Sequence, residues 1–155
     1  MNVNSDVVVD CNSNIRQQIS ASLLPIGTLS KTGQAIANAS AGNKIMFAPG
    51  YLSGTFTSSV DIFDITTNSW STAKLSQPRA GVATAVLGYT IFFRGRGNGN
   101  PSSRVDIYDA ATNTWTTTEL SEARGSICSA TAGKKVLFAG GTNGFFKYST
   151  TVGHI

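Results

Sequence analysis

Two stretches of the chain decide its fold, Val60-Asp-Ile-Phe-Asp-Ile-Thr-Thr-Asn-Ser-Trp70 and Val105-Asp-Ile-Tyr-Asp-Ala-Ala-Thr-Asn-Thr-Trp115. They align without a gap at a shift of 45 residues, and the same shift pairs Arg79 with Arg124. Self-similarity at a fixed period of this length is the sequence signature of a repeat architecture. We therefore expect the chain to be built from repeated units.

A third copy precedes these two at a shift of 46 residues, which aligns Leu29-Ser30 with Leu75-Ser76. Several columns are shared by all three copies and hold small, β-branched or aromatic residues, with one glycine where a turn is expected. These columns are Ile36/Val82/Ile127, Ala39/Ala85/Ala130, Gly42/Gly88/Gly133, Ile45/Ile91/Val136 and Phe47/Phe93/Phe138.

Each copy reads as four short strands. In the middle copy, these are predicted at about 80–87, 90–94, 104–109 and 114–118. No stretch keeps a sustained helical period, so almost no helix is expected. Four antiparallel strands every ~45 residues are typical of a propeller blade. The predicted fold is therefore all-β, with antiparallel four-stranded blades.

The repeats divide the chain into four segments. Residues 29–74, 75–119 and 120–155 are the predicted repeats, and 1–28 is either the degenerate end of a preceding blade or an irregular segment. The last repeat is expected to be truncated, because 145–149 can form its third strand but no tryptophan-bearing fourth strand follows.

The composition excludes several classes of protein. Of 155 residues, 41% are hydrophobic and 13% are charged, against an average near ~25% charged, which excludes a disordered chain. The net charge is +4, but the basic residues form no runs, so nucleic-acid binding is not expected. No stretch approaches the ~20 apolar residues of a membrane-spanning helix, so no membrane association is expected either.

The reactive residues are few. The cysteines Cys11 and Cys128 and the single histidine His154 form no metal-binding motif, and we expect no metal and no cofactor. Whether the cysteines form a disulfide stays open, and so does the cellular compartment. The composition, rich in Ser, Thr and Gly, is reminiscent of extracellular or cell-surface repeat proteins.

The repeats resemble the kelch family, whose blade has a Gly-Gly pair after the second strand and an aromatic-Asp step in the third. A tryptophan follows six residues after that Asp, and an arginine opens the repeat. The matching residues are Gly140-Gly141, Phe63-Asp64, Tyr108-Asp109, Trp70, Trp115, Arg79 and Arg124. The chain departs from the pattern at Pro49-Gly50, Gly95-Arg96 and Gly33. The resemblance covers about residues 29–148 and implies an incomplete kelch-type β-propeller of about three blades.

Antiparallel connection places the loops between the second and third strands on the same face as the segments between blades. This face gathers the Gly-, Asn-, Ser- and Arg-rich loops 50–59, 95–103 and 141–144, and loops on a rigid scaffold often bind partners. The resemblance implies that Arg79 and Arg124 point toward a ligand there. The candidate ligand-binding residues are Arg79, Arg124, Arg94, Arg96, Arg104, Tyr51 and Asn143, and the arginines suggest an acidic ligand.

Two functions follow as hypotheses. The first is a kelch-type interaction module that binds a protein or peptide through this face. The alternative is a carbohydrate-binding or carbohydrate-processing propeller, lectin-like, mutarotase-like or sialidase-like, which clustered aromatics at Tyr51, Phe56, Phe145 and Phe146 would favour. No catalytic residues are assigned, because the one histidine excludes a copper-oxidase or Ser-His-Asp site. Glu119 and Glu122 are the only spare carboxylates near the face, so no enzyme is expected.

The number of blades raises a question of assembly. Three blades are fewer than the four to eight with which propellers typically close. Two alternatives stay open: the chain is part of a longer propeller, or it closes a six-bladed ring as a homodimer.

Overall fold

The computed structural model of the chain describes residues 3–9, 15–21, 25–31, 33–48, 50–52, 54–144 and 147–155. Within these ranges the chain forms strands, turns and irregular segments, and no helix is present. Every strand pair is antiparallel. The prediction of an all-β, antiparallel fold is confirmed.

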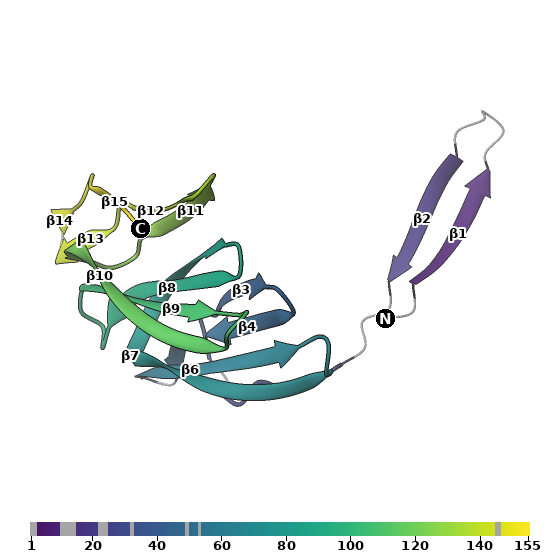
Figure 1. The fold of residues 1–155 in the computed structure, drawn as a ribbon, viewed down its shortest axis with the longest axis horizontal. Coiled ribbons are helices and arrows are strands. Elements are labelled where there is room, and N and C mark those ends of the chain that lie inside the picture. The colour runs from purple at the N-terminus through teal and green to yellow at the C-terminus, as the bar shows by residue number, and fades with distance from the viewer. Residues whose placement is uncertain are drawn as a thin grey trace.

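The N-terminal strands β1 (Val3–Val9) and β2 (Ile15–Ala21) form a two-stranded sheet with each other. Figure 1 shows this hairpin apart from the remaining strands. Residues 10–14, whose sequence resembles the turn after Asp64, lie outside the described residues. That segment 1–28 is the degenerate end of a blade therefore stays a prediction.

The first blade consists of β3 (Ala37–Ala41), β4 (Lys44–Ala48), β6 (Thr55–Asp64) and the first part of β7 (Ser69–Leu87), paired in that order. The short strand β5 (Tyr51–Leu52) pairs with the start of β6.

The second blade consists of the rest of β7, followed by β8 (Thr90–Gly97), β9 (Ser102–Asp109) and β10 (Thr114–Arg124). Each of these strands contains the strand predicted at its position. The observed strands extend further toward the loops, because residues 95–97 and 102–103 still belong to β8 and β9.

The connection between the first two blades differs from the expected loop. β7 is continuous and pairs with β6 along 69–74 and with β8 along 79–87. The change of partner is accommodated by irregular register on both sides and by Gly81, whose φ is +55°. Pro78, which has no N–H to donate, marks the same place. The two blades therefore form one continuous path of hydrogen-bonded strands, β10-β9-β8-β7-β6-β4-β3.

The third blade consists of β11 (Cys128–Ala132), β12 (Lys135–Ala139) and β15 (Val152–His154). The expectation that 145–149 forms its third strand is wrong for the described residues 147–149, because β15 pairs with β12 in that place, and 145–146 lie outside the described residues. Two short strands, β13 (Thr142–Gly144) and β14 (Lys147–Tyr148), pair with each other instead.

Equivalent positions of the copies share unusual backbone conformations. A positive φ between 51° and 60° recurs at the start of the first strand, at the turn after it, and at the turn before the fourth strand. These positions are Ala35/Gly81/Ser126, Gly42/Gly88/Gly133 and Asn68/Asn113. Alanine and serine adopt this left-handed conformation rarely, so its recurrence reflects one structural template.

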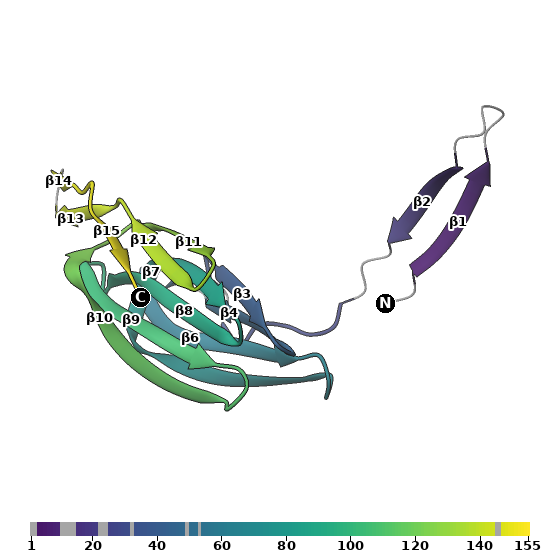
Figure 2. The same cartoon turned by 45° about the horizontal axis from the view of Figure 1, so that its top comes forward.

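The blades stack face to face and bury one hydrophobic cluster between each neighbouring pair (Figure 2). The side chains at the positions of Met46 and Val60 in each repeat project from one face of the blade, which we call its rear face. The side chains at the positions of Ile91 and Phe93 project from the opposite, front face of the next blade and pack against them. Between the first and second blades the buried residues are Ala41, Met46, Ala48, Val60, Ile62, Leu75, Ile91, Phe93, Tyr108 and Ala110. Between the second and third they are Ala85, Phe92, Val105, Leu120, Ile127, Val136 and Phe138.

The innermost strands are tied together by one repeated column. Thr84 Oγ1 donates to the Asn38 carbonyl at 2.7 Å, and Ser129 Oγ donates to the Thr84 carbonyl at 2.7 Å. These three residues are equivalent in the repeat. Small polar side chains on the innermost strand therefore link each blade to the one before it.

Candidate functional site

The two ends of each blade are distinguished by their hydrogen bonds. At one end, the first and third turns of a blade are joined, as Ile65 N donates to Asn43 O at 2.9 Å and Ala110 N to Tyr89 O at 2.8 Å. At the other end, the loop after the second strand is hydrogen-bonded to the segment between two blades. Gly125 N donates to Thr142 O at 2.8 Å, and Thr142 N donates to Gly125 O at 2.9 Å. We call this second end the loop face; it comprises residues 50–52, 54–55, 75–80, 95–104, 120–127, 140–144 and 147–151.

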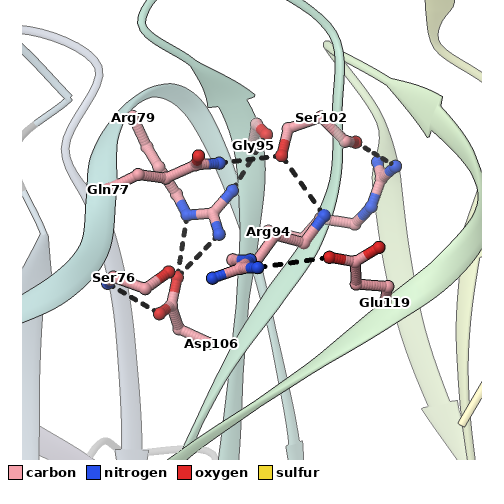
Figure 3. Close-up of polar contacts among 9 residues, drawn as sticks. Ser76, Gln77, Arg79, Arg94, Gly95, Ser102, Asp106 and Glu119 are labelled. Atoms are coloured by element: carbon pink, nitrogen blue, oxygen red, sulfur yellow. Dashed lines mark hydrogen bonds and ion pairs between the residues drawn. The ribbon is translucent and has the colours of Figure 1, made fainter.

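Arg79 and Asp106 form a buried ion pair beneath the loop face (Figure 3). Arg79 donates to Asp106 Oδ2 from Nε at 2.9 Å and from Nη2 at 2.7 Å. Arg79 Nη1 also donates to the Gly95 carbonyl at 3.2 Å, and Asp106 Oδ1 accepts from Ser76 N at 2.8 Å. Burial lowers the pKa of Arg79, and the charge of Asp106 opposes this shift. The pair joins β7, β8 and β9.

Arg94 is fully buried without a carboxylate of its own. Its Nη2 donates to the carbonyls of Ser102 at 2.7 Å and Glu122 at 3.1 Å, whereas Nε and Nη1 have no hydrogen-bond partner. The pKa of Arg94 is lowered to about 10, first by burial and then by the charges of Arg124 and Arg79. The other copies have Ala48 and Ala139 in this column, so the extra charge belongs to the second blade alone.

Arg124 is also fully buried. Its Nη1 donates to the Gly140 and Thr151 carbonyls at 2.8 and 2.5 Å. Its Nε lies 3.6 Å from Glu122 Oε2, which is an ion pair but too long for a hydrogen bond. Neither Nε nor Nη2 of Arg124 has a hydrogen-bond partner.

Glu122 fastens the C-terminal loop to the end of β10. Its oxygens accept hydrogen bonds from Asn143 Nδ2 and Ser149 Oγ, each at 3.0 Å. The pKa of Glu122 is lowered chiefly by a hydrogen bond from the Thr151 side chain, and further by those from Ser149 and Asn143. The carboxylate is therefore ionised and committed to the loop at neutral pH.

The remaining candidates lie nearer the surface. Arg104 is exposed and pairs with exposed Glu119 at 3.3 Å. Arg96 is partly buried, donates from Nε to the Gly99 carbonyl at 2.8 Å, and packs over Gly125, where any Cβ would lie 2.2 Å from its Cγ. Tyr51 is 38% exposed and packs against Phe56 with ring centroids 5.5 Å apart.

The structure thus divides the candidate residues into two layers. Arg79, Arg94 and Arg124 lie together in the interior, while Tyr51, Arg104 and Asn143 are exposed. The sequence reasoning missed Asp106 as the acid of the buried layer, and it named Glu122 only as a spare carboxylate rather than as the residue that holds the C-terminal loop. The signal for Asp106 was the Asp that follows valine in both quoted stretches, whereas nothing in the repeat marked Glu122.

Other potential sites are less developed. One cavity of about 400 Å³ is lined by residues that include Ser30 and Thr72, and another of about 260 Å³ by residues that include Ser76 and Trp115. Neither is lined by a candidate ligand-binding residue. The described residues contain no group of three His, Cys, Asp or Glu side chains placed to hold a metal ion. None of them belongs to a helix long and apolar enough to cross a membrane.

Four residues named in the sequence analysis lie outside the described part of the chain. They are Cys11, Pro49, Phe145 and Phe146. Cys128 is described, and its thiol is free and exposed. The disulfide question and half of the proposed aromatic cluster therefore stay open.

A comparison with protein families supports the repeat architecture. The kelch motif matches residues 36–74, which contain β3, β4, β6 and the first part of β7. A search of curated proteins gave no match to the chain. The matched blade is followed by a second with the same strand order, the same turn conformations and an equivalent tryptophan. The comparison therefore identifies one kelch motif, at residues 36–74, and supports a kelch-repeat architecture.

Proposed function

We propose that the chain is a kelch-type interaction module that binds a protein or peptide through the loop face. The observation that carries the proposal is the layered construction of this face. Exposed Tyr51, Arg104 and Asn143 stand over buried arginines that hold the loops to the blades. Loops that are already held in place lose little backbone freedom on binding, which favours affinity.

We further propose that the partner is acidic. The chain carries a net charge of +4, and Arg96 and Arg104 lie at or near the surface of the loop face. Guanidinium groups pair with carboxylates through parallel hydrogen bonds. We propose no catalytic role for the loop face, because none of its residues is assigned a catalytic function.

Carbohydrate binding is the second candidate. The Tyr51–Phe56 ring pair favours it, because an exposed aromatic face can stack on a sugar. Protein binding is preferred because the loop face presents Arg96, Arg104 and polar loop residues beside a single pair of aromatic rings. The two functions differ in the ligand that the same residues would capture.

The test of the interaction module is a peptide selection. Binders are selected from a random peptide library and, in parallel, the chain is applied to a glycan array. We expect acidic peptides whose affinity falls by about thirtyfold in Tyr51→Ala, the effect of losing an aromatic hot spot. The matched control is Tyr89→Ala, which removes a 60% exposed tyrosine from the opposite end of a blade and should leave affinity within about threefold. Equal losses in both variants, or glycan binding without peptide binding, would contradict the proposal.

We also propose that a second copy covers the rear face of the third blade. In the first two blades, the columns of Met46 and Val60 are buried against the next blade. Their equivalents in the third blade, Leu137 and Val152, are 36% and 57% exposed. The front face of the first blade carries the complementary column, with Phe47 partly buried. A second copy therefore offers a surface of the kind that covers the other two rear faces.

Light scattering tests this association. We expect twice the chain's mass for the wild type and the monomer mass for Leu137→Asp, because a charge on the rear face opposes burial. Tyr148→Asp, which changes an 82% exposed side chain outside these columns, should remain a dimer. A folded wild-type monomer at high protein concentration would refute the association.

A further inference from the structure

The second blade contains a buried arginine–aspartate ion pair. The third blade keeps the arginine of this pair but has no equivalent of the aspartate. Arg124 aligns with Arg79 at the repeat shift. Strand pairing aligns Gly153 with Asp106, because each lies opposite the phenylalanine of the repeat on the second strand of its blade. The position that supplies a carboxylate to Arg79 therefore supplies no side chain to Arg124.

The vacant nitrogens of Arg124 are the ones that Arg79 uses. Arg79 donates to Asp106 from Nε and Nη2, and Nε and Nη2 of Arg124 are buried and without a hydrogen-bond partner. Both arginines also make the same hydrogen bond to the backbone, because Nη1 of each donates to the carbonyl at the end of the second strand of its blade. Arg124 thus presents the donor pair of a carboxylate site without the carboxylate.

Positive charge exceeds negative charge around this position. Arg94 adds a second buried guanidinium, whose Nε and Nη1 also lack partners. Glu122 is the carboxylate near Arg124, and its oxygens already accept hydrogen bonds from Asn143 and Ser149. Buried charges without hydrogen-bonded counterions are strongly unfavourable. An additional anion would satisfy donors that the described residues leave unused.

The third blade has room at this position. A Cβ built on Gly153 would lie 3.6 Å from Arg124 Nη2 and no closer than 3.4 Å to Leu120, which are ordinary contacts. β15 pairs with β12 on one edge, and among the described residues no strand pairs with its other edge. The backbone at Gly153 therefore leaves room for a side chain beside the buried Arg124 Nη2.

We propose that the third blade binds a carboxylate or similar oxyanion between Arg124 and Gly153, at the place that Asp106 occupies in the second blade. The oxyanion comes either from an acidic side chain of the partner or from a free small anion. The first source rests on the proposed interaction function and gives it a defined anchor, whereas the second is independent of it.

The first blade provides an internal contrast. It keeps the acid, Asp61, which accepts from Ser30 N at 3.2 Å, and has Gly33 where the arginine would stand. The first blade therefore offers no guanidinium in this position, and the second blade already fills its own. Oxyanion binding of this kind is expected at the third blade alone.

The test supplies the missing carboxylate within the chain. Thermal unfolding of the wild type, Gly153→Asp and the uncharged isostere Gly153→Asn is followed in chloride and acetate at matched ionic strength. We expect Gly153→Asp to melt above wild type in chloride and to gain nothing specific from acetate. The wild type should gain about 2–4 °C more from acetate than Gly153→Asp does, with a saturable dependence on concentration. Equal acetate responses in wild type and Gly153→Asp would overturn the proposal.

Further arms separate the sources of the oxyanion. Phosphate and the blocked amino acid N-acetyl-aspartamide are compared with acetate, and N-acetyl-asparaginamide is the neutral control. Stabilisation by the aspartate compound supports a partner side chain, whereas stabilisation by phosphate and acetate alone supports a free anion. If the selected peptides bind wild type and Gly153→Asp equally while acetate distinguishes them, the interaction function stands without this anchor. If acetate distinguishes them and no peptide binds, the oxyanion site stands and the interaction function fails.

Discussion

Replacing Asp106 by alanine is expected to lower the free energy of unfolding by about 3–5 kcal/mol, because it leaves the guanidinium of Arg79 buried and unpaired. Both side chains are almost completely buried, and two of the three hydrogen bonds of Arg79 end on Asp106. The same substitution frees Ser76 N at the junction between blades. Since domains of this size are stable by about 5–15 kcal/mol, a large share of the stability would be lost in urea denaturation.

Two controls make this result specific. Glu119→Gln breaks the exposed pair with Arg104 and should change stability by about 0–1 kcal/mol. The double variant Arg79→Met with Asp106→Leu removes both charges and should recover much of the loss, since apolar replacements of a buried pair are often neutral. A single-variant loss as small as that of Glu119→Gln would show that the pair is not buried.

Phe93→Ala is expected to be the second most damaging change, with a loss of about 3–5 kcal/mol. Phe93 is fully buried between the first two blades and packs against Trp115 with ring centroids 5.7 Å apart. Truncation would open a cavity that the stacked strands cannot close. Urea denaturation measures the loss.

The matched control for this change is Phe47→Ala. Phe47 occupies the same column on the front of the first blade and contacts Trp70 at a similar ring distance of 6.1 Å, but it is only partly buried. Its loss should be clearly smaller because solvent already reaches the ring. Equal losses in the free energy of unfolding would mean that the stacking of blades contributes little to stability.

The sequence predicted the strands and turns of the blades well, because equivalent positions of the copies meet the same packing and backbone requirements. The columns of Phe93 and Gly88 recur wherever a blade face or a tight turn requires them, so three copies could be compared with each other. The continuous strand β7 could not be foreseen, because the change of strand partner between Lys74 and Arg79 leaves no mark in hydrophobic periodicity. The position of β15 was also hidden, since Val152 and Gly153 lack the aromatic-Asp step that identifies the third strand elsewhere.

The candidate site was predicted in composition but not in depth. Sequence placed the arginines at the end of the blades that carries the loop face, because antiparallel connection fixes which loops share an end of a blade; that they bind a ligand there stays a prediction. It could not show that Arg94 is buried, since its column holds alanine in the other copies and gives no precedent. It could not show that Arg124 lacks an equivalent of Asp106, because that conclusion depends on the strand register that brings Gly153 beside it.

The most direct measurement is an NMR titration of the arginine Nε–H resonances with sodium acetate at constant ionic strength. The resonance of Arg79 is expected to stay in place, because its Nε already donates to Asp106. The resonance of Arg124 should move and saturate, since its Nε has no hydrogen-bond partner, and the movement should be lost in Gly153→Asp. An Arg124 resonance that does not respond, or one that drifts with acetate as it does with chloride, would contradict an oxyanion site in the third blade.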